Sequence, residues 1–260
     1  MLFKELELVN FRQYKGRNKL SFPTTENKNV TVIIGRNASG KSTLVEAFYW
    51  ILYGKTNFKT SGLLNLELAN NLKSGEYEII KGTLKLVHEG IEYKITRKQE
   101  YTLNSKNSII FKPAQVEINY SSPDGVADYI KIDQDGKIKN IIDKILPKDL
   151  IKQYIFDAKR ITNLAENNKS VGKDFNSVAN SFLKLDANSC PLIMNAPFAN
   201  VDEYHIEKLS EIISEFAEQA IIFLKYENWR YAKKSLSFRL NSLYKLEKRS
   251  LTHTEINSEL

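Results

Sequence analysis

Residues 29–52 read Asn-Val-Thr-Val-Ile-Ile-Gly-Arg-Asn-Ala-Ser-Gly-Lys-Ser-Thr-Leu-Val-Glu-Ala-Phe-Tyr-Trp-Ile-Leu, and this stretch decides the fold. The β-branched, apolar run at its start is typical of a buried strand. Its second half places apolar residues on one helical face, namely Leu44, Ala47, Phe48, Ile51 and Leu52. Between the two stands Gly, four residues, then Gly-Lys-Ser, the pattern of a phosphate-binding loop. Because this motif needs a strand, a glycine loop and a helix in that order, the sequence predicts such a loop at residues 35–42.

The chemistry of the loop follows from its residue types. Gly35 and Gly40 let the backbone bend closely around phosphates, while the loop N–H groups and the helix N-terminus face an anion. Lys41 brings a mobile positive charge to the outer phosphates, and the Ser42 hydroxyl is a magnesium ligand. We therefore expect ATP and Mg²⁺ as cofactors; the alternative is a glycine turn that happens to precede a helix. The candidate nucleotide-binding residues of the loop are Gly35, Arg36, Asn37, Ala38, Ser39, Gly40, Lys41, Ser42 and Thr43.

Length and composition bound the class of protein. The 260 residues suffice for one large domain or two small ones, and 42% apolar with 27% charged residues is ordinary for a soluble globular chain. A single cysteine, Cys190, excludes an internal disulfide and is expected to be a packed thiol in an apolar run. The three histidines lie too far apart for zinc-type spacing. No apolar stretch approaches about 20 residues and no signal-peptide layout is present, so we expect a cytoplasmic protein without membrane contact.

Positive charge is concentrated near the C-terminus. The formal net charge of the chain is +7, and residues 225–249 contain eight basic residues against Glu227 and Glu247. The basic residues are Lys225, Arg230, Lys233, Lys234, Arg239, Lys245, Lys248 and Arg249. Such a patch suits a polyanion such as DNA, or it is a solvated face; the sequence leaves both open.

The chain changes character along its length. The N-terminal part predicts strands at residues 2–11 and 18–22, joined by a turn at Gly16, and a strand-rich run from 76 to about 132. In this prediction the phosphate loop is embedded in antiparallel strands. The C-terminal part alternates between helix and strand. Its elements are expected at residues 175–185, 191–194, 203–217 and 220–224.

Three segments resemble one group of proteins. Leu8-Val-Asn-Phe-Arg-Gln-Tyr14, the loop, and Leu44-Val-Glu-Ala-Phe48 together resemble the N-terminal head segment of SMC, RecF and SbcC-type ATPases. Residues 146–150 (Leu-Pro-Lys-Asp-Leu) and 154–161 (Tyr-Ile-Phe-Asp-Ala-Lys-Arg-Ile) look like the region around the Phe-Asp-Gly-Glu motif of DndD-like relatives, which serve in DNA modification and phage defence. Residues 191–202, Pro-Leu-Ile-Met-Asn-Ala-Pro-Phe-Ala-Asn-Val-Asp, resemble their Walker B strand and D-loop.

The resemblance implies a fold and an assembly. The expected fold is an α/β ATP-binding-cassette head with a P-loop core, an antiparallel β-rich N-terminal lobe (residues 1–161) and a C-terminal α/β lobe (174–260) that carries Walker B, the D-loop and the basic tail. Two such heads sandwich two ATP molecules, so we expect a homodimer. A short linker at residues 162–173 replaces the long coiled coil of these families; the head is naturally without the coil, or its arms were removed from a longer protein.

The resemblance also suggests site residues beyond the loop. Arg12 matches a basic residue that reaches the nucleotide phosphates; the alternative is a surface arginine in a turn. Asp157 falls near the position of a magnesium contact, with Gln153 as an alternative. Ser170 and Gly172 match the signature motif that acts on the ATP of the other subunit; the alternative for Ser170 is a plain helix cap.

The expected Walker B carboxylates are missing. Asn195 stands where the magnesium-holding aspartate should be, and Ala196 stands where the water-orienting carboxylate should be. Asp202 matches the D-loop aspartate that acts across the dimer, or it caps the following helix, or both. Lys225 follows the last strand, where these families carry a histidine that senses the γ-phosphate. Asn195, Asp202 and Asp157 are thus the candidate catalytic residues, with Ser42 and Asp157 as candidate metal ligands.

The sequence is compatible with three functions. The first is a DNA-associated ATPase head that hydrolyses ATP slowly. The second is a nucleotide-binding switch or scaffold for a protein partner, without useful turnover, which the altered positions at Asn195 and Ala196 motivate. The third is an unrelated phosphoryl transferase, which needs an acceptor pocket and a lid that the sequence does not indicate.

Overall fold

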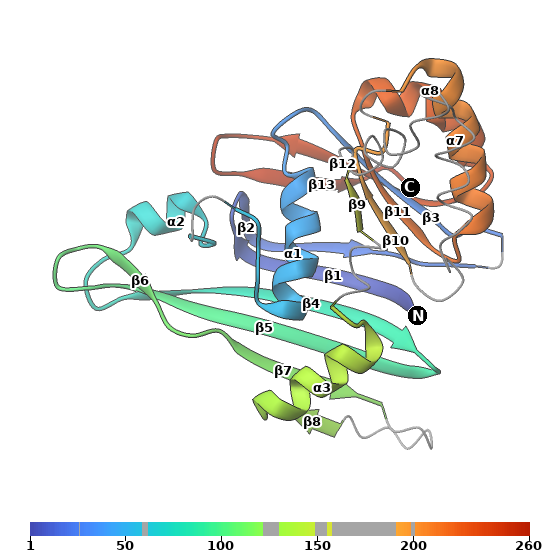
Figure 1. Cartoon of the computed structure of the whole chain (residues 1–260). Helices are drawn as coiled ribbons and strands as arrows, with labels where there is room; N and C mark the ends of the chain where they lie inside the picture. The colour runs from blue at the N-terminus through green and yellow to red at the C-terminus, as the bar shows by residue number, and fades with distance from the viewer. Residues whose placement is uncertain (26, 59–61, 122–129, 149–154, 158–190, 199–200) are drawn as a thin grey trace, which may run out of the picture.

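The computed structural model describes residues 1–25, 27–58, 62–121, 130–148, 155–157, 191–198 and 201–260, and shows two sheets with a helix between them (Figure 1). The first sheet is antiparallel, with the order β2-β1-β4-β5-β7-β8 and with β6 paired to β5. Its strands are β1 (Leu2–Phe11), β2 (Tyr14–Ser21), β4 (Tyr77–His88), β5 (Ile91–Leu103), β6 (Ile109–Phe111), β7 (Gln115–Tyr120) and β8 (Ile130–Ile132).

The second sheet has the order β13-β12-β3-β11-β10-β9, and all its strands are parallel except β13. Its strands are β3 (Val30–Gly35), β9 (Ile155–Asp157), β10 (Leu192–Asn195), β11 (Ala220–Leu224), β12 (Leu240–Lys248) and β13 (Thr254–Ser258). The described helices are α1 (Lys41–Tyr53), α2 (Leu66–Asn71), α3 (Asp135–Ile145), α7 (Glu203–Phe216) and α8 (Tyr226–Ser237). The helices α7 and α8 pack together on the side of the second sheet away from α1 (Figure 1).

The core is built around α1, which contacts strands of both sheets. Its apolar residues are buried on both sides, as expected for a helix enclosed by two layers. The Phe48 ring lies 5.2 Å from that of Phe3 and 6.2 Å from that of Phe22, which joins α1 to the first sheet. At the other end of the helix, the Arg97 side chain of β5 donates hydrogen bonds to the carbonyl oxygens of Ile51 (3.0 Å) and Leu52 (3.4 Å). The helix that carries the phosphate loop is therefore held along its length and at its C-terminal end.

Most predicted elements are present, and two predictions are wrong. The strands predicted at residues 2–11, 191–194 and 220–224 and the helix at 203–217 match β1, β10, β11 and α7. However, β2 begins at Tyr14, so the turn lies at Arg12 and Gln13, and Gly16 lies inside the strand. Gly16, with a φ of 66°, is placed beside a register shift of β1, and its N–H donates to the Asn10 Oδ1 atom at 2.9 Å.

The second wrong prediction concerns the strand of the phosphate loop. This strand, β3, does not lie among the antiparallel strands of the N-terminal part but pairs in parallel with β11 and β12. The reason is its composition: β3 is buried at every position, which an all-parallel central strand requires. The predicted α/β class with an antiparallel β-rich part is confirmed. The linker at 162–173, the helix at 175–185 and both lobe boundaries fall outside the described residues, so those divisions stay predictions.

Candidate nucleotide-binding site

The phosphate loop lies at the carboxyl ends of the parallel strands β3, β11 and β10. Ligands of parallel α/β sheets bind at this edge, beside helix N-termini. Around the loop, the described residues enclose a pocket of about 440 Å³, a volume typical of small-molecule sites. Residues from four separate segments line it: Gln13, Asn37, Ala38, Gly40, Lys41, Ser42, Thr43, Asn195, Ala196 and Lys225. The structure thus brings most of the predicted loop residues together with Asn195 and Lys225.

The turn between β1 and β2 packs directly against the loop. The buried Tyr14 hydroxyl donates to the Gly40 carbonyl oxygen at 3.1 Å, and the Thr43 hydroxyl donates to Gln13 Oε1 at 3.1 Å. Gly40 has a φ of 106°, and a Cβ at this position would lie 2.5 Å from the Tyr14 hydroxyl oxygen. Only glycine fits both the backbone angle and the space. Burial raises the pKa of Tyr14, so its hydroxyl stays a neutral donor.

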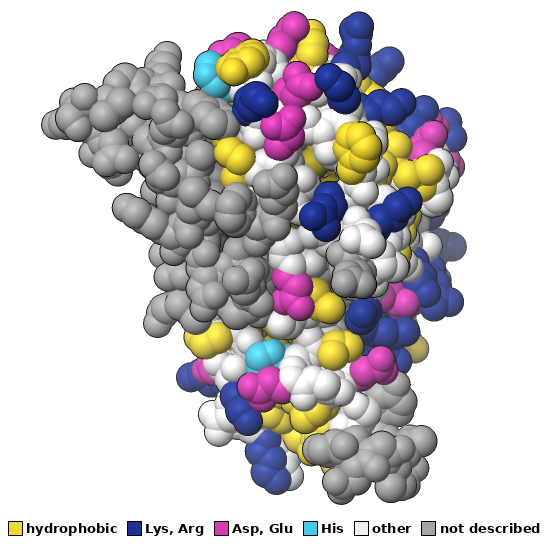
Figure 2. Space-filling view, turned by 90° about the vertical axis from the view of Figure 1, so that its right-hand side faces the viewer, with side chains coloured by type: hydrophobic (Ala, Val, Ile, Leu, Met, Phe, Trp, Pro, Cys, Tyr) yellow, Lys and Arg dark blue, Asp and Glu magenta, His cyan; other side chains and the backbone are white. Residues whose placement is uncertain are grey.

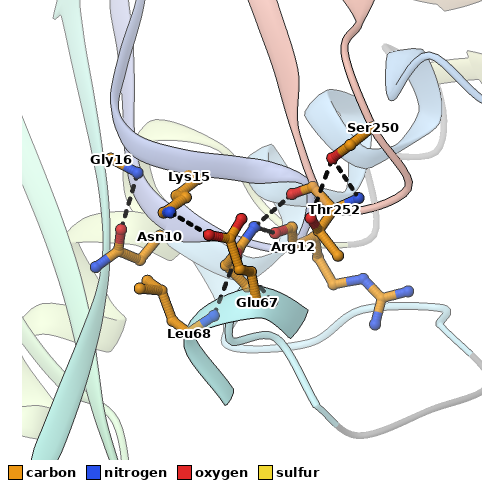
Figure 3. A network of polar contacts seen from close by, with 9 residues as sticks. Asn10, Arg12, Lys15, Gly16, Glu67, Leu68, Ser250 and Thr252 are labelled. Carbon is orange, nitrogen blue, oxygen red and sulfur yellow. Dashed lines mark hydrogen bonds and ion pairs between the residues drawn. The ribbon is translucent and has the colours of Figure 1, made fainter. Parts of the chain in front are cut away.

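Hydrogen bonds of the Asn65 side chain hold this turn in place. Figure 3 shows the surrounding network of polar contacts, with Arg12, Leu68 and Thr252 among the labelled residues. The buried Asn65 side chain donates to the carbonyl oxygens of Arg12 (2.6 Å) and Thr252 (2.7 Å), while its Oδ1 atom caps α2. The Thr254 N–H donates to the Gln13 carbonyl oxygen at 2.9 Å, which ties the turn to β13 as well. Neither Asn65 nor Gln13 was among the predicted site residues. Asparagine before a helix is a recognisable cap signal, but its contact with the β1–β2 turn is visible only in three dimensions.

Arg12 is not among the residues that line the phosphate pocket. Its Nη1 atom donates to the Gly62 carbonyl oxygen at 2.8 Å, and its guanidinium carbon lies 4.7 Å from the centre of the Phe58 ring. Figure 3 shows the Arg12 backbone within the network and the guanidinium outside it. In this conformation Arg12 braces the chain between α1 and α2, and its neighbour Gln13 lines the pocket instead. A contact of Arg12 with phosphate stays a prediction.

Two lysines supply the positive charge of the pocket. The Lys41 ammonium donates to the carbonyl oxygens of Gly35 (2.6 Å) and Arg36 (2.8 Å), so it lies folded onto its own loop. Burial and, to a lesser extent, the charge of Lys225 lower the pKa of Lys41 to about 8, while Glu227 acts in the opposite direction. An incoming phosphate would supply the anion that this buried ammonium lacks. Lys225, at the end of β11, lines the same pocket.

The pocket does not reproduce the magnesium site that the resemblance implies. The Ser42 hydroxyl fits a metal ligand, but the Asn195 Nδ2 atom donates a hydrogen bond to it at 3.2 Å. Magnesium requires oxygen ligands, commonly including carboxylates, and no carboxylate lines the described part of this pocket. Asp157 pairs in register with Asn195 at the end of β9, although its side chain lies outside the described atoms. Within the described ranges, no group of three acidic, histidine or cysteine side chains is arranged to hold a metal.

Asp202 has the geometry of a helix cap. Its Oδ1 atom accepts the His205 N–H at 3.0 Å, and its Oδ2 atom lies 2.6 Å from His205 Nδ1. These contacts, the backbone N–H first, lower the pKa of the Asp202 carboxyl. The cap alternative is thus present in the structure, and a role across a dimer stays a prediction. The predicted signature residues Ser170 and Gly172 lie outside the described residues.

A wider hollow of about 1120 Å³ adjoins the phosphate pocket at Asn37 and Lys225, and extends to Arg36 and the end of β12. The predicted basic stretch is distributed over α8 and β12 beside it. Several of its charges are paired: Lys245 and Arg249 contact Glu247 at 2.6 and 2.9 Å. The stretch over α8 and β12 is therefore basic but partly neutralised. On the side of the molecule that carries α7, Lys and Arg side chains are likewise mixed with acidic ones (Figure 2).

This chain is similar to known proteins in sequence and in fold. A family described as AAA domain matches residues 5–260. The chain is 29% identical over 155 residues to the DNA replication and repair protein RecF of Clostridioides difficile, covering 55% of this chain and 39% of that protein. It is 26% identical over 236 residues to the chromosome partition protein Smc of Fusobacterium nucleatum, covering 84% of this chain and 18% of that protein.

The fold agrees with a solved structure over its whole length. The SMC head domain from Thermotoga maritima superposes with a TM-score of 0.54 at 14% identity and covers 100% of both chains. The predicted resemblance to SMC and RecF-type heads and the predicted fold class are thereby confirmed. The chain spans about two-fifths of the RecF relative. None of the described helices has the length and apolar character needed to cross a membrane.

Proposed function

Because this chain belongs to the AAA domain family matched over residues 5–260, we propose that it is an ATP-binding head that dimerises around ATP, acts with DNA and hydrolyses ATP slowly. The observation that carries this proposal is the phosphate pocket. Four segments far apart in the sequence converge on a loop whose N–H groups, helix N-terminus and Lys41 all suit a triphosphate.

Slow hydrolysis is inferred from the residues beside the loop. Asn195 and Ala196 occupy the end of β10 and line the pocket, where the resemblance expects two carboxylates. Loss of one electrostatic group that stabilises a transition state costs about 3–4 kcal/mol, which corresponds to roughly 10²–10³ in rate. Two subunits sandwiching ATP would place Asp202, Ser170 and Gly172 of one subunit near the nucleotide of the other.

Association with DNA is supported by the relatives and by charge. The RecF relative is described as a replication and repair protein, and the basic face over α8 and β12 borders the pocket. If about five phosphates were contacted, log affinity for duplex DNA should fall with log salt at a slope near −4.5. An affinity for duplex DNA that does not change with salt concentration would contradict this part of the proposal. The likeness to DndD-type proteins and a role in phage defence belong to the same proposal.

The direct test compares nucleotide binding, subunit association and phosphate release for the wild type, Lys41→Ala and Asn195→Asp. Binding is expected for the wild type and for Asn195→Asp, with loss in Lys41→Ala. ATP should shift the protein towards a dimer in sedimentation, because the proposed dimer binds ATP more tightly than the monomer and a ligand favours the state that binds it better. Absence of nucleotide binding by the folded wild type would refute the proposal.

The second candidate is a nucleotide-binding switch or scaffold for a protein partner, and the same Asn195 and Ala196 favour it. Here ATP controls association but is not turned over usefully. Phosphate release separates the two candidates: slow but measurable release favours the first, and none above the Lys41→Ala background favours the second. If Asn195→Asp releases phosphate no faster than the wild type, the missing carboxylate is not what limits hydrolysis.

A further inference from the structure

The balance of charge in the phosphate pocket is unusual. Lys41 and Lys225 both line it, and the described lining contains no carboxylate. In a site that binds a triphosphate together with magnesium, the divalent cation neutralises part of the phosphate charge. A nearby carboxylate normally balances the charge of that cation. Here the second lysine is present and the carboxylate is replaced by an amide at Asn195.

The geometry of Lys225 makes it available to a ligand. It follows β11, the strand between β3 and β10, so its backbone lies between the phosphate loop and Asn195. No described acidic side chain pairs with its ammonium within 4.0 Å, in contrast to Lys245, which is paired with Glu247 at 2.6 Å. It lines the same pocket as Lys41, so the two charges surround one volume.

The Ser42 hydroxyl is engaged in a way that disfavours a metal. The Asn195 N–H donates to it at 3.2 Å, so the positive end of the amide dipole faces the metal-ligand oxygen. A cation at this oxygen would meet an N–H group and the two lysines, without the carboxylate that elsewhere offsets it. The same arrangement favours an anion, because phosphate oxygens accept from N–H groups and pair with ammonium groups.

We propose that this site binds a nucleoside triphosphate without requiring a divalent cation, and that Lys225 supplies the positive charge that magnesium supplies in related sites. The inference rests on the proposed nucleotide-binding function and specifies how that site neutralises its ligand. It assigns Lys225 a direct contact with the outer phosphates and gives Asn195 the role of a neutral hydrogen-bonding residue.

The test measures the Kd of a non-hydrolysable ATP analogue by calorimetry, once with excess Mg²⁺ and once with EDTA. We expect the two values for the wild type to differ by less than about threefold. Lys225→Gln should weaken binding in EDTA by about tenfold or more, while Lys225→Arg should retain it because the charge is kept. Asn195→Asp should introduce a magnesium dependence of about tenfold.

The matched control is Lys106→Gln, a change at an exposed lysine between β5 and β6 that borders neither the phosphate pocket nor the wider hollow. It should leave both Kd values unchanged. Thermal melts establish that each variant is folded. Binding by the wild type only with Mg²⁺ overturns the inference. If Asp157→Asn then removes this magnesium dependence, Asp157 is the carboxylate that holds the metal. No binding in either buffer instead refutes the proposed function.

Discussion

Gly40→Ala is expected to disrupt the phosphate loop through one close contact. Gly40 has a φ of 106°, and a Cβ there would lie 2.5 Å from the Tyr14 hydroxyl oxygen and 2.7 Å from Gln13 Nε2. The backbone angle alone costs a residue with a side chain about 1–3 kcal/mol. Displacing the buried Tyr14 hydroxyl also breaks its hydrogen bond to the Gly40 carbonyl oxygen. An unpaired buried polar group costs about 1–3 kcal/mol.

The two effects together predict a loss of about 2–6 kcal/mol in the free energy of unfolding. In a chain of this size this lowers Tm by about 4–24 °C. The measurement is urea unfolding at neutral pH, followed by binding of an ATP analogue under conditions in which the variant is folded. Binding should be strongly reduced, because the displaced turn also carries Gln13, which lines the pocket.

Gly16→Ala is the matched control. Gly16 also has a positive φ, 66°, but no atom lies within 4 Å of the position that a Cβ would take there. It should lose about 1–2 kcal/mol from the backbone angle alone and keep nucleotide binding. Tyr14→Phe combined with Gly40→Ala removes the atom nearest the new Cβ, so the double variant should recover part of the loss. Equal losses for the two alanine variants, with no recovery in the double variant, would refute this reasoning.

Two further predictions concern residues that support the site from outside it. Asn65→Ala should destabilise the protein by about 3–5 kcal/mol and weaken nucleotide binding, since it leaves the carbonyl oxygens of Arg12 and Thr252 without their donor. Asn65→Ser, whose hydroxyl can still cap α2, should lose less in the same urea titration. The pKa of Asp202 is lowered from 3.8 chiefly by the His205 N–H, so its contribution to stability is full above that value and is lost as the pH falls through the lower folded pKa. The difference in urea midpoint between the wild type and Asp202→Asn should therefore be larger at pH 6 than at pH 3, and a constant difference would count against the cap.

Sequence patterns predicted the helices and strands that are specified by neighbouring residues. The strand and helix around the phosphate loop, and α7 with its cap at Asp202, appear where periodicity and capping placed them. The helix α8 and the hairpin of β12 and β13 were missed. Their region was interpreted through its charge, although Leu240, Tyr244 and Leu246 alternate in the manner of a strand. Lys245 lies between Tyr244 and Leu246, and Lys248 ends the strand, so their charge masks a signal that is present.

Contacts between distant segments were beyond any local pattern. The hydrogen bond from Asn195 to Ser42 joins residues 153 positions apart, and it forms because β10 and β3 flank β11 in one parallel sheet. For Arg12, sequence similarity predicted a contact with phosphate. In the structure its side chain instead contacts the Phe58 ring and the Gly62 carbonyl oxygen. Its neighbours Gln13 and Tyr14 reach the loop because the turn begins earlier than the strand pattern indicated.

The sequence by itself determined the phosphate loop, because a glycine-rich turn between a buried strand and a helix depends on adjacent residues and on backbone freedom at Gly35 and Gly40. It also determined that the carboxylate expected at Asn195 is absent. Only the tertiary structure decided what surrounds the loop. The register of five parallel strands gathers their carboxyl ends at one edge, and this places Lys225 and Asn195 around the volume that Lys41 faces. Local patterns specify which groups a chain carries, whereas the pairing of strands determines which of those groups act on one ligand.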